Sequence, residues 1–222
     1  MRTNALYLTS IISGFCMMAL EIFGGRYLYP FFGSGVDVWA AIISVFILSL
    51  SIGYWLGGRI ADKADTNRAL GTVILAAAVF YLLIPTYARP FAGALPPSVH
   101  EARWGSLLAS MVLFLPPSLL LGCVSPMLVK LVFLSGSQVG RTTGTLYAIG
   151  SVGNVIGILA TNFILLASLP LNTISWGMGV ALALLGLIHL FIPIEARAST
   201  RNVNPTGPSQ ASANPDPQPG VA

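Results

Sequence analysis

The longest stretch without a charged residue decides the fold: residues 142–194 read TTGTLYAIGSVGNVIGILATNFILLASLPLNTISWGMGVALALLGLIHLFIPI. A membrane-spanning helix needs roughly 20 apolar residues, so this stretch is too long for one span and suits two. Pro170 and Asn172 favour a turn near its middle. The sequence therefore predicts two membrane helices here, over residues 143–167 and 172–193.

Four shorter stretches without Asp, Glu, Lys or Arg precede it, at residues 3–20, 38–58, 69–88 and 104–129. Each has the length of one span. They predict helices over residues 5–26, 38–57, 69–87 and 105–128. Because these stretches are continuously apolar rather than alternating, they do not have the pattern of a membrane β-barrel. The predicted fold is all-α: a polytopic membrane protein with six transmembrane helices in residues 1–197.

The composition supports this fold class. Hydrophobic residues make up 55% of the chain and charged residues 8%, whereas soluble domains carry about 25% charged residues. So few charges cannot cover the exterior of a soluble protein, which excludes a soluble enzyme and a disulfide scaffold. Cys16 and Cys123 both fall within predicted spans, where we expect them to be buried apolar residues. No small-residue cleavage site follows the first apolar stretch, so we expect that helix to be retained.

The basic residues predict the orientation, because cytoplasmic loops are enriched in Lys and Arg. With the N-terminus inside, eight basic residues are cytoplasmic: Arg2, Arg59, Lys63, Arg68, Lys130, Arg141, Arg197 and Arg201. Three are outside: Arg26, Arg89 and Arg103. We therefore predict a bacterial inner-membrane protein with both termini in the cytoplasm. The net charge of +4 needs no nucleic-acid partner. Residues 198–222 are rich in proline and predict a disordered cytoplasmic tail.

Glu21 is the exceptional residue, because it is ionisable and interrupts an otherwise apolar stretch. Such a residue is a functional candidate by default. Arg26 is five positions later, so the two side chains are about 140° apart on a helix and form a poor pair. Glu21 has two interpretations: a carboxylate that meets a partner helix or a cation in a cavity, or a structural carboxylate near the outer interface that reaches water.

No metal-binding, nucleotide-binding or nucleophilic motif accompanies these charges. His100 and His189 are too far apart in the sequence to support a metal or catalytic site by themselves. We therefore predict no catalytic residue, no cofactor and no metal, and we expect that the chain is not an enzyme.

Small residues in the fifth predicted helix indicate close helix packing. Gly150, Gly153, Asn154 and Gly157 include the Gly-x-x-x-Gly spacing that lets two helices approach within a bilayer. We expect this helix to be the most buried of the six.

Prolines in the fourth predicted helix indicate a distortion. Pro116, Pro117 and Pro126 predict that this helix is kinked or broken.

The loop after the second predicted helix reads GGRIADKADTNR at residues 57–68. It resembles the loop between helices 2 and 3 of major-facilitator transporters, with matches at Gly58, Asp62 and Lys63 and with Asp65 in place of the later glycine. The resemblance implies that these three residues form an inner-loop latch. In the alternative interpretation, the loop is a charged turn that follows the positive-inside rule, with Asp62 capping or pairing at the start of the third helix.

Several segments together resemble the membrane domain of the fused major-facilitator/spermidine synthase-like proteins. The similar segments are SGFCMMALEIFGGR at residues 13–26, SIGYWLGGRIADK at 51–63, LPPSLLLGCVSPMLVKL at 115–131 and GRTTGTLYAIGSVGNVIG at 140–157. The resemblance implies a six-helix bundle like half of a major-facilitator transporter. The soluble synthase domain of that family is expected to be absent here, so its activity is not carried over.

Three functions follow as hypotheses. The favoured one is a non-enzymatic accessory subunit that binds other membrane subunits or a synthase-like partner through its helix faces. The alternative is a half-transporter that acts as a homodimer on a small cationic solute such as a polyamine, with Glu21 as the binding carboxylate. The third, more remote, is the membrane part of a split spermidine synthase-like enzyme.

Overall fold

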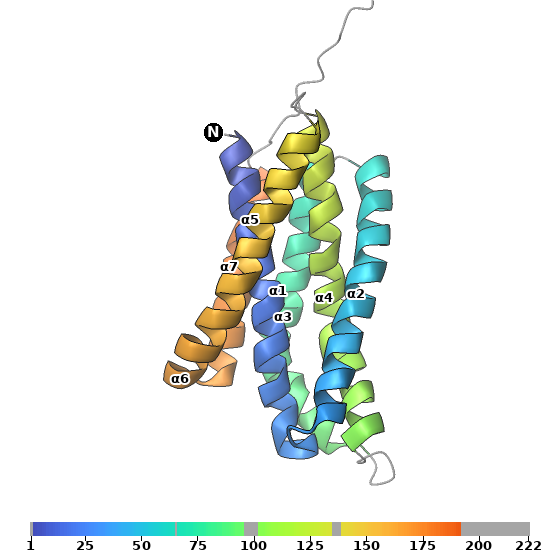
Figure 1. Cartoon of the computed structure of the whole chain (residues 1–222), viewed down its shortest axis with the longest axis vertical. Helices are drawn as coiled ribbons and strands as arrows, with labels where there is room; N and C mark the ends of the chain where they lie inside the picture. Colours follow the sequence, from blue (N-terminus) through green and yellow to red (C-terminus); the bar gives the residue numbers. More distant parts are fainter. Residues whose placement is uncertain (1, 65, 96–101, 135–138, 192–222) are drawn as a thin grey trace, which may run out of the picture.

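The protein is a bundle of long helices in its computed structural model, which describes residues 2–64, 66–95, 102–134 and 139–191 (Figure 1). Within these residues it is all-α. The helices are α1 (Arg2–Phe32), α2 (Val36–Lys63), α3 (Thr66–Gly93), α4 (Ala102–Leu134), α5 (Val139–Ala160), the π-helix η2 (Thr161–Leu165), α6 (Leu166–Ser168) and α7 (Leu171–Phe191). The predicted tail, residues 198–222, lies outside the described residues.

Six of the described segments are long and apolar enough to cross a membrane, which confirms the predicted six spans. The turn predicted at Pro170 is also confirmed, because α6 ends at Ser168 and α7 begins at Leu171. The first span is longer than predicted: α1 does not stop near Arg26 but continues through Pro30 to Phe32. A charge does not end a helix, and the exposed Arg26 can extend its guanidinium toward the interface.

Glycines bring the helices together in three close pairs. Gly57 of α2 lies so close to α4 that a Cβ on it would stand 2.6 Å from the Cys123 Cα. Gly157 of α5 meets the backbone of α1 at Phe15, and Gly71 of α3 faces the Gly186 carbonyl of α7. Without a hydrophobic driving force between helices in lipid, such backbone contact is the main source of packing energy. The bundle is therefore built from the pairs α2/α4, α1/α5 and α3/α7 (Figure 1).

The expectation that the fifth span is the most buried is wrong. In α5 and its continuation, only 17% of the residues in the most apolar window are buried, against 39–56% in the other five spans. Gly153 and Gly157 pack against α1 alone. Close contact with a single neighbour leaves the rest of the helix surface uncovered, as at Val155 and Leu159.

The sequence predicted that α4 is kinked or broken at its prolines. The break is absent, because Ala102–Leu134 is one uninterrupted helix. Pro117 has no N–H for the Leu113 carbonyl one turn earlier. The Tyr87 hydroxyl of α3 donates to that carbonyl at 3.4 Å. A side chain from a neighbouring helix thus replaces the missing backbone bond, which is how membrane helices tolerate proline.

The same replacement occurs in α3. Pro85 leaves the Tyr81 carbonyl without its helical donor. The Ser175 hydroxyl of α7 donates to this carbonyl at 2.6 Å, and the Tyr81 hydroxyl in turn donates to the Cys16 carbonyl of α1 at 2.6 Å. All three residues are buried. This chain of hydrogen bonds joins α7, α3 and α1.

Removing the Ser175 hydroxyl is expected to cost about 1 kcal/mol of unfolding free energy, because it leaves a buried carbonyl unsatisfied. In a Pro85→Ala background Ser175→Ala should cost much less, since the backbone N–H restored at position 85 can reach the Tyr81 carbonyl. Ser110→Ala is a matched control, because the buried Ser110 hydroxyl has no hydrogen-bond partner. The measurement is detergent-induced unfolding of the four variants. An equal cost of Ser175→Ala in both backgrounds would contradict this account.

Candidate functional site

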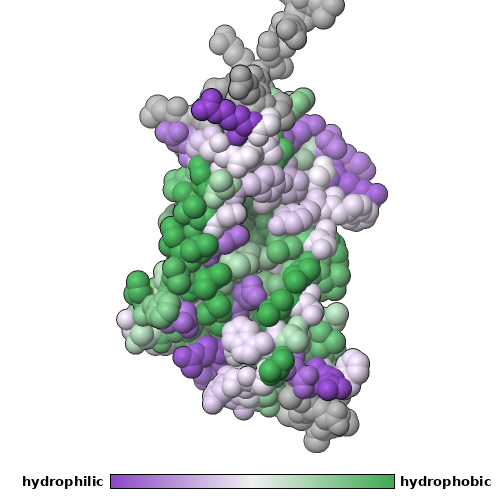
Figure 2. All heavy atoms as spheres, in the orientation of Figure 1, coloured by the Kyte–Doolittle hydropathy of each residue, from purple (hydrophilic) through white to green (hydrophobic). Residues whose placement is uncertain are grey.

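One side of the bundle is open. Helix α2 packs mainly against α4, and α5 packs mainly against α1. Because α2 and α5 do not pack closely against each other, α1 and α4 lie between them, with α3 and α7 behind (Figure 1). On this side Figure 2 shows a band of pale and purple residues between two green, apolar flanks. We call this surface the groove face; it is defined by the residues that line the two cavities described next.

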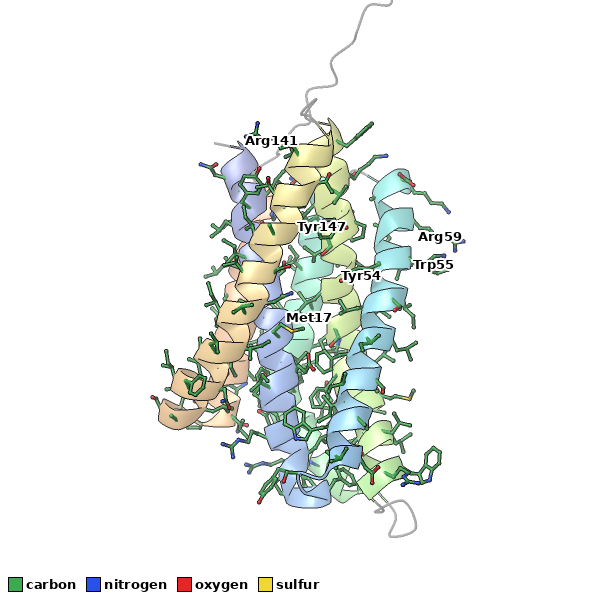
Figure 3. All side chains as sticks on the ribbon, viewed as in Figure 1. Met17, Tyr54, Trp55, Arg59, Arg141 and Tyr147 are labelled. Atoms are coloured by element: carbon green, nitrogen blue, oxygen red, sulfur yellow. The ribbon has the colours of Figure 1, made fainter. Side chains whose placement is uncertain are left out.

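The first cavity, of about 150 Å³, lies between α1, α2, α4 and α5 toward the end of the bundle where α1 begins. Seven of its 14 lining residues have polar side chains. Met17, Tyr54 and Tyr147 lie between α5 and α2, whereas Trp55 and Arg59 point away from the groove (Figure 3). The polar lining residues are Ser10, Ser13, Tyr54, Ser125, Tyr147, Ser151 and Asn154.

The second cavity, of about 500 Å³, lies toward the opposite end, between α1, α2 and the segment of α5 and η2. Arg26 lines it together with Ser34 and Asn162. Its walls include the aromatic side chains of Trp39 and Phe163. Asn162 and Phe163 belong to the π-helix η2, and such local widenings of a helix are frequent at functional sites.

Glu21 lies on α1 between the two cavities. It follows Met17 and Met18 of the first cavity by one turn and precedes Gly25 of the second by one turn, and it is not among the residues that line either cavity. Because the span runs from Asn4 to Phe32, Glu21 is only about 4.5 Å along the axis from the middle of the helix.

Glu21 is half-buried and Arg26 is exposed. Neither side chain makes a hydrogen bond or ion pair with any residue in the described part of the chain. The sequence predicted that Glu21 and Arg26 form a poor pair, and the two residues form no ion pair with each other. The two residues therefore place one carboxylate and one guanidinium on the same helix, and of the two only Arg26 lines a cavity.

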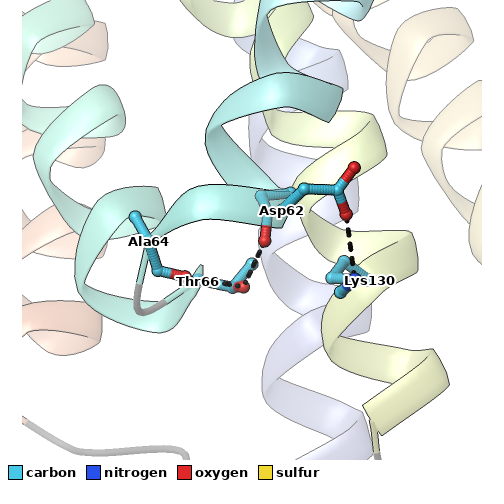
Figure 4. Close-up of polar contacts among 5 residues, drawn as sticks. Asp62, Ala64, Thr66 and Lys130 are labelled. Atoms are coloured by element: carbon cyan, nitrogen blue, oxygen red, sulfur yellow. Dashed lines mark hydrogen bonds and ion pairs between the residues drawn. The ribbon is translucent and has the colours of Figure 1, made fainter.

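The residues predicted as an inner-loop latch are not brought together as a set. Asp62 lies in the last turn of α2 and pairs with Lys130 of α4, with 2.9 Å between Oδ1 and Nζ (Figure 4). It does not cap α3; instead, Thr66 donates its hydroxyl hydrogen to the Ala61 carbonyl at 3.1 Å. Lys63 has no ion pair among the described residues, and Gly58 faces open space.

Replacing Asp62 by asparagine is expected to lower the unfolding free energy by less than about 1 kcal/mol, because exposed ion pairs are screened by water. The Asp62 side chain is 72% exposed. Asp37→Asn is the matched control, since Asp37 is exposed and pairs with Arg103 at 3.7 Å near the other end of α2. The measurement is thermal unfolding in detergent, and a loss of more than about 2 kcal/mol for Asp62→Asn alone would contradict the expectation.

The residues predicted to pack helices lie along the contact of α5 with α1. Gly150 meets the Ser10 hydroxyl, and Gly153 meets the backbone of Ile11. Asn154 approaches Gly14 with its side-chain oxygen and also lines the first cavity. These glycines therefore pack α5 against α1, and Gly150 also lines the first cavity.

A buried polar cluster escaped the sequence analysis. His189 of α7 lies 2.8 Å from Thr9 of α1 through Nε2, and 3.0 Å from the Asn67 amide oxygen of α3 through Nδ1. The Asn67 amide nitrogen donates to the His189 carbonyl at 2.8 Å, which fixes the orientation of the amide. In a neutral ring Nδ1 therefore carries the hydrogen and Nε2 is an acceptor beside the Thr9 hydroxyl, whose single hydrogen can go either to Nε2 or to the Ala5 carbonyl at 2.9 Å. The available signal was that all three lie near the same end of their spans.

The described residues contain no group of three or more His, Cys, Asp or Glu that could hold a metal ion. Cys16 and Cys123 are buried and free. Comparisons of the chain with protein families, with curated proteins and with solved structures found no match.

Proposed function

We propose that this chain is a non-enzymatic accessory subunit of the bacterial inner membrane that binds another membrane protein or a larger membrane complex through its groove face. The supporting observation is the polar lining of that face at the depth of the spans. Ser10 and Ser13 donate their hydroxyl hydrogens to backbone carbonyls within the chain. The other polar side chains of the lining lose hydrogen bonds to water where they face lipid tails, and lipid tails offer none in return. A partner in the membrane that covers the groove would remove this cost. No nucleic-acid partner is expected.

The distribution of basic residues supports an orientation with both termini in the cytoplasm. The end of the bundle at which α1 begins carries six basic residues of the helix ends: Arg2, Arg59, Lys63, Arg68, Lys130 and Arg141. The opposite end carries Arg26, Arg89 and Arg103. This asymmetry follows the positive-inside rule.

Site-specific photocrosslinking in native membranes tests the proposal. A benzoylphenylalanine in place of Tyr54 or Tyr147, which flank the groove, should give a discrete protein adduct. The same probe in place of Leu83 or Leu184, exposed residues of α3 and α7, is the matched control and should label mainly lipid. Adducts from all four positions, or from none, would contradict the proposal.

The second candidate function is a half-transporter that acts as a homodimer on a small cationic solute such as a polyamine. The observation that favours it is Glu21, a carboxylate near mid-span that has no protein partner among the described residues. In that case the adduct should have twice the chain mass of 23.4 kDa. Uptake into reconstituted vesicles should then be lost in Glu21→Gln. An adduct with a soluble synthase-like protein would instead favour the remote alternative, a split synthase-like enzyme.

A further inference from the structure

The larger cavity of the groove face combines one positive charge with several hydrogen-bond donors. Arg26 supplies the charge, and no acidic residue is among the described residues that line the cavity. Four further lining side chains can donate a hydrogen bond: Tyr29, Ser34, Trp39 and Asn162. The polar side-chain atoms of these five residues make no hydrogen bond or ion pair with any part of the chain that the structure describes. Donors grouped around one guanidinium suit an anionic group with several acceptor oxygens.

These donors lie near one surface of the membrane. Arg26 and Asn162 each lie six residues before the last residue of their spans, and Trp39 lies three residues after the first residue of its span. The end of α1, the start of α2 and α6 lie at the same end of the bundle (Figure 1). The donors are therefore within about 10 Å of the span ends, where a bilayer changes from hydrocarbon to headgroups.

The walls of the cavity become apolar toward the middle of the membrane. On each of three walls an isoleucine lies one helical turn deeper than the donor: Ile22 on α1, Ile42 on α2 and Ile158 on α5. A volume of about 500 Å³ is enough for a headgroup and the first carbons of its chains. Donors near the surface and apolar walls below them match an amphiphile with an anionic head.

We propose that this cavity binds the phosphate group of an anionic phospholipid, with the phosphate oxygens at Arg26 and the acyl chains along the three isoleucines. A guanidinium donates two parallel hydrogen bonds to a phosphate, which fixes the orientation of the headgroup. This site goes beyond the accessory role and does not depend on it. A partner over the groove face would enclose the bound lipid.

The charges around the cavity favour an anionic headgroup over a zwitterionic one. An ammonium group on the lipid would find no carboxylate in the described lining. The two acidic residues nearest to Arg26 in the sequence do not supply one: Glu21 is outside the lining, and Asp37 pairs with Arg103 at 3.7 Å. A single negative charge on the ligand neutralises Arg26 and leaves the complex without a net charge at this depth.

Four probes separate the headgroup from the chains, and a lipid from a free phosphate: dioctanoyl phosphatidylglycerol, dioctanoyl phosphatidylethanolamine, dioctanoylglycerol and glycerol phosphate. The full chain, purified in a nonionic detergent with any bound partner, is heated with each probe, because a ligand that binds only the folded state raises the unfolding midpoint. We expect the phosphatidylglycerol to bind about tenfold or more tightly than dioctanoylglycerol, which lacks the phosphate. It should bind about threefold or more tightly than the phosphatidylethanolamine. Glycerol phosphate, which lacks the chains, should bind about tenfold or more weakly than the phosphatidylglycerol.

Variants test the residues of the site. Arg26→Gln should weaken binding of the phosphatidylglycerol about tenfold or more, and Arg26→Lys should weaken it less, because lysine keeps the charge but not the planar fork. Asn162→Ala should weaken it about threefold. The matched control is Arg89→Gln, an exposed arginine at the same end of the bundle that does not line the cavity, and it should leave binding unchanged.

The unfolding midpoint without lipid separates the site from the fold. Arg26→Gln should have the midpoint of the unchanged chain, because Arg26 is exposed and has no ion pair among the described residues. Equal binding of the phosphatidylglycerol and dioctanoylglycerol, or unchanged binding in Arg26→Gln, would overturn the phosphate site. Equal binding of glycerol phosphate and the phosphatidylglycerol would overturn the lipid and assign the site to a free phosphate. Photocrosslinking at Tyr54 and Tyr147 probes the other cavity, so either result can fail without the other.

Discussion

Valine in place of Gly57 is expected to destabilise the protein by about 3 kcal/mol or more, whereas the same substitution at the adjacent Gly58 should cost less than about 1 kcal/mol. A Cβ on Gly57 would stand 2.6 Å from the Cys123 Cα and 2.6 Å from the Cys123 carbonyl oxygen of α4. These are backbone atoms, so α2 and α4 would have to separate. A Cβ on Gly58 meets nothing within 4 Å.

The two variants form a matched pair, because they share a helix, a residue type and nearly the same depth. Unfolding in mixed detergent micelles, followed by the circular dichroism of the helices, measures the difference. If both glycines tolerate valine equally, the close α2/α4 contact is not what stabilises this part of the bundle.

A second large loss is expected for His189→Leu. The substitution removes both ring nitrogens and with them the buried hydrogen bonds to the Asn67 amide oxygen and to Thr9, whose hydroxyl keeps the Ala5 carbonyl. A buried hydrogen bond contributes about 0.5–1.5 kcal/mol, so the loss of two should cost the variant about 1–3 kcal/mol. Phe191→Leu is the control, because Phe191 is two positions later in α7 and 78% exposed.

The double variant Asn67→Leu/His189→Leu provides the internal check. Once the Asn67 amide is also gone, fewer groups remain unsatisfied, so the double loss should be clearly smaller than the sum of the two single losses. Chemical unfolding of all three variants in the same detergent gives these values. Strictly additive losses would show that the three helices are not coupled through this cluster.

The spans were predictable from the sequence because their cause is local. A charge-free stretch of about 20 residues must satisfy its own backbone hydrogen bonds in lipid, and only a helix does so. The turn between the last two spans was predictable for the same reason, since Pro170 prevents continuation of the helix. The end of α1 was not, because Arg26 marks a change in charge rather than a change in backbone structure.

Contacts between helices were harder to predict, because they depend on residues far apart in the sequence. The glycines of α5 indicated close packing, but the sequence could not say that Gly150, Gly153 and Gly157 meet α1 and that most of α5 is left uncovered. The uninterrupted α4 depends on Tyr87 of another helix, and no pattern within α4 encodes that hydrogen bond.

Some residues of the candidate site were likewise predictable from the sequence, whereas their surroundings depended on the fold. Glu21 and Arg26 stood out from the sequence because ionisable residues are rare in apolar stretches. The groove that Arg26 lines did not, since it exists only because α2 and α5 pack against different helices, α4 and α1. The cluster of Thr9, Asn67 and His189 was missed because each residue alone is ordinary, and only the fold brings them within hydrogen-bond distance.

The central claim is that the groove face is covered by protein in the membrane. Its most direct test is the lipid exposure of a spin label at Ser151, which lines the groove, compared with one at Leu184, which is exposed on α7. The labels are attached to single cysteines introduced after Cys16 and Cys123 are replaced by alanine. Collision with dissolved oxygen in native membranes should be much less frequent at position 151 than at position 184. Equally frequent collisions at both positions would mean that lipid fills the groove, and would contradict the account.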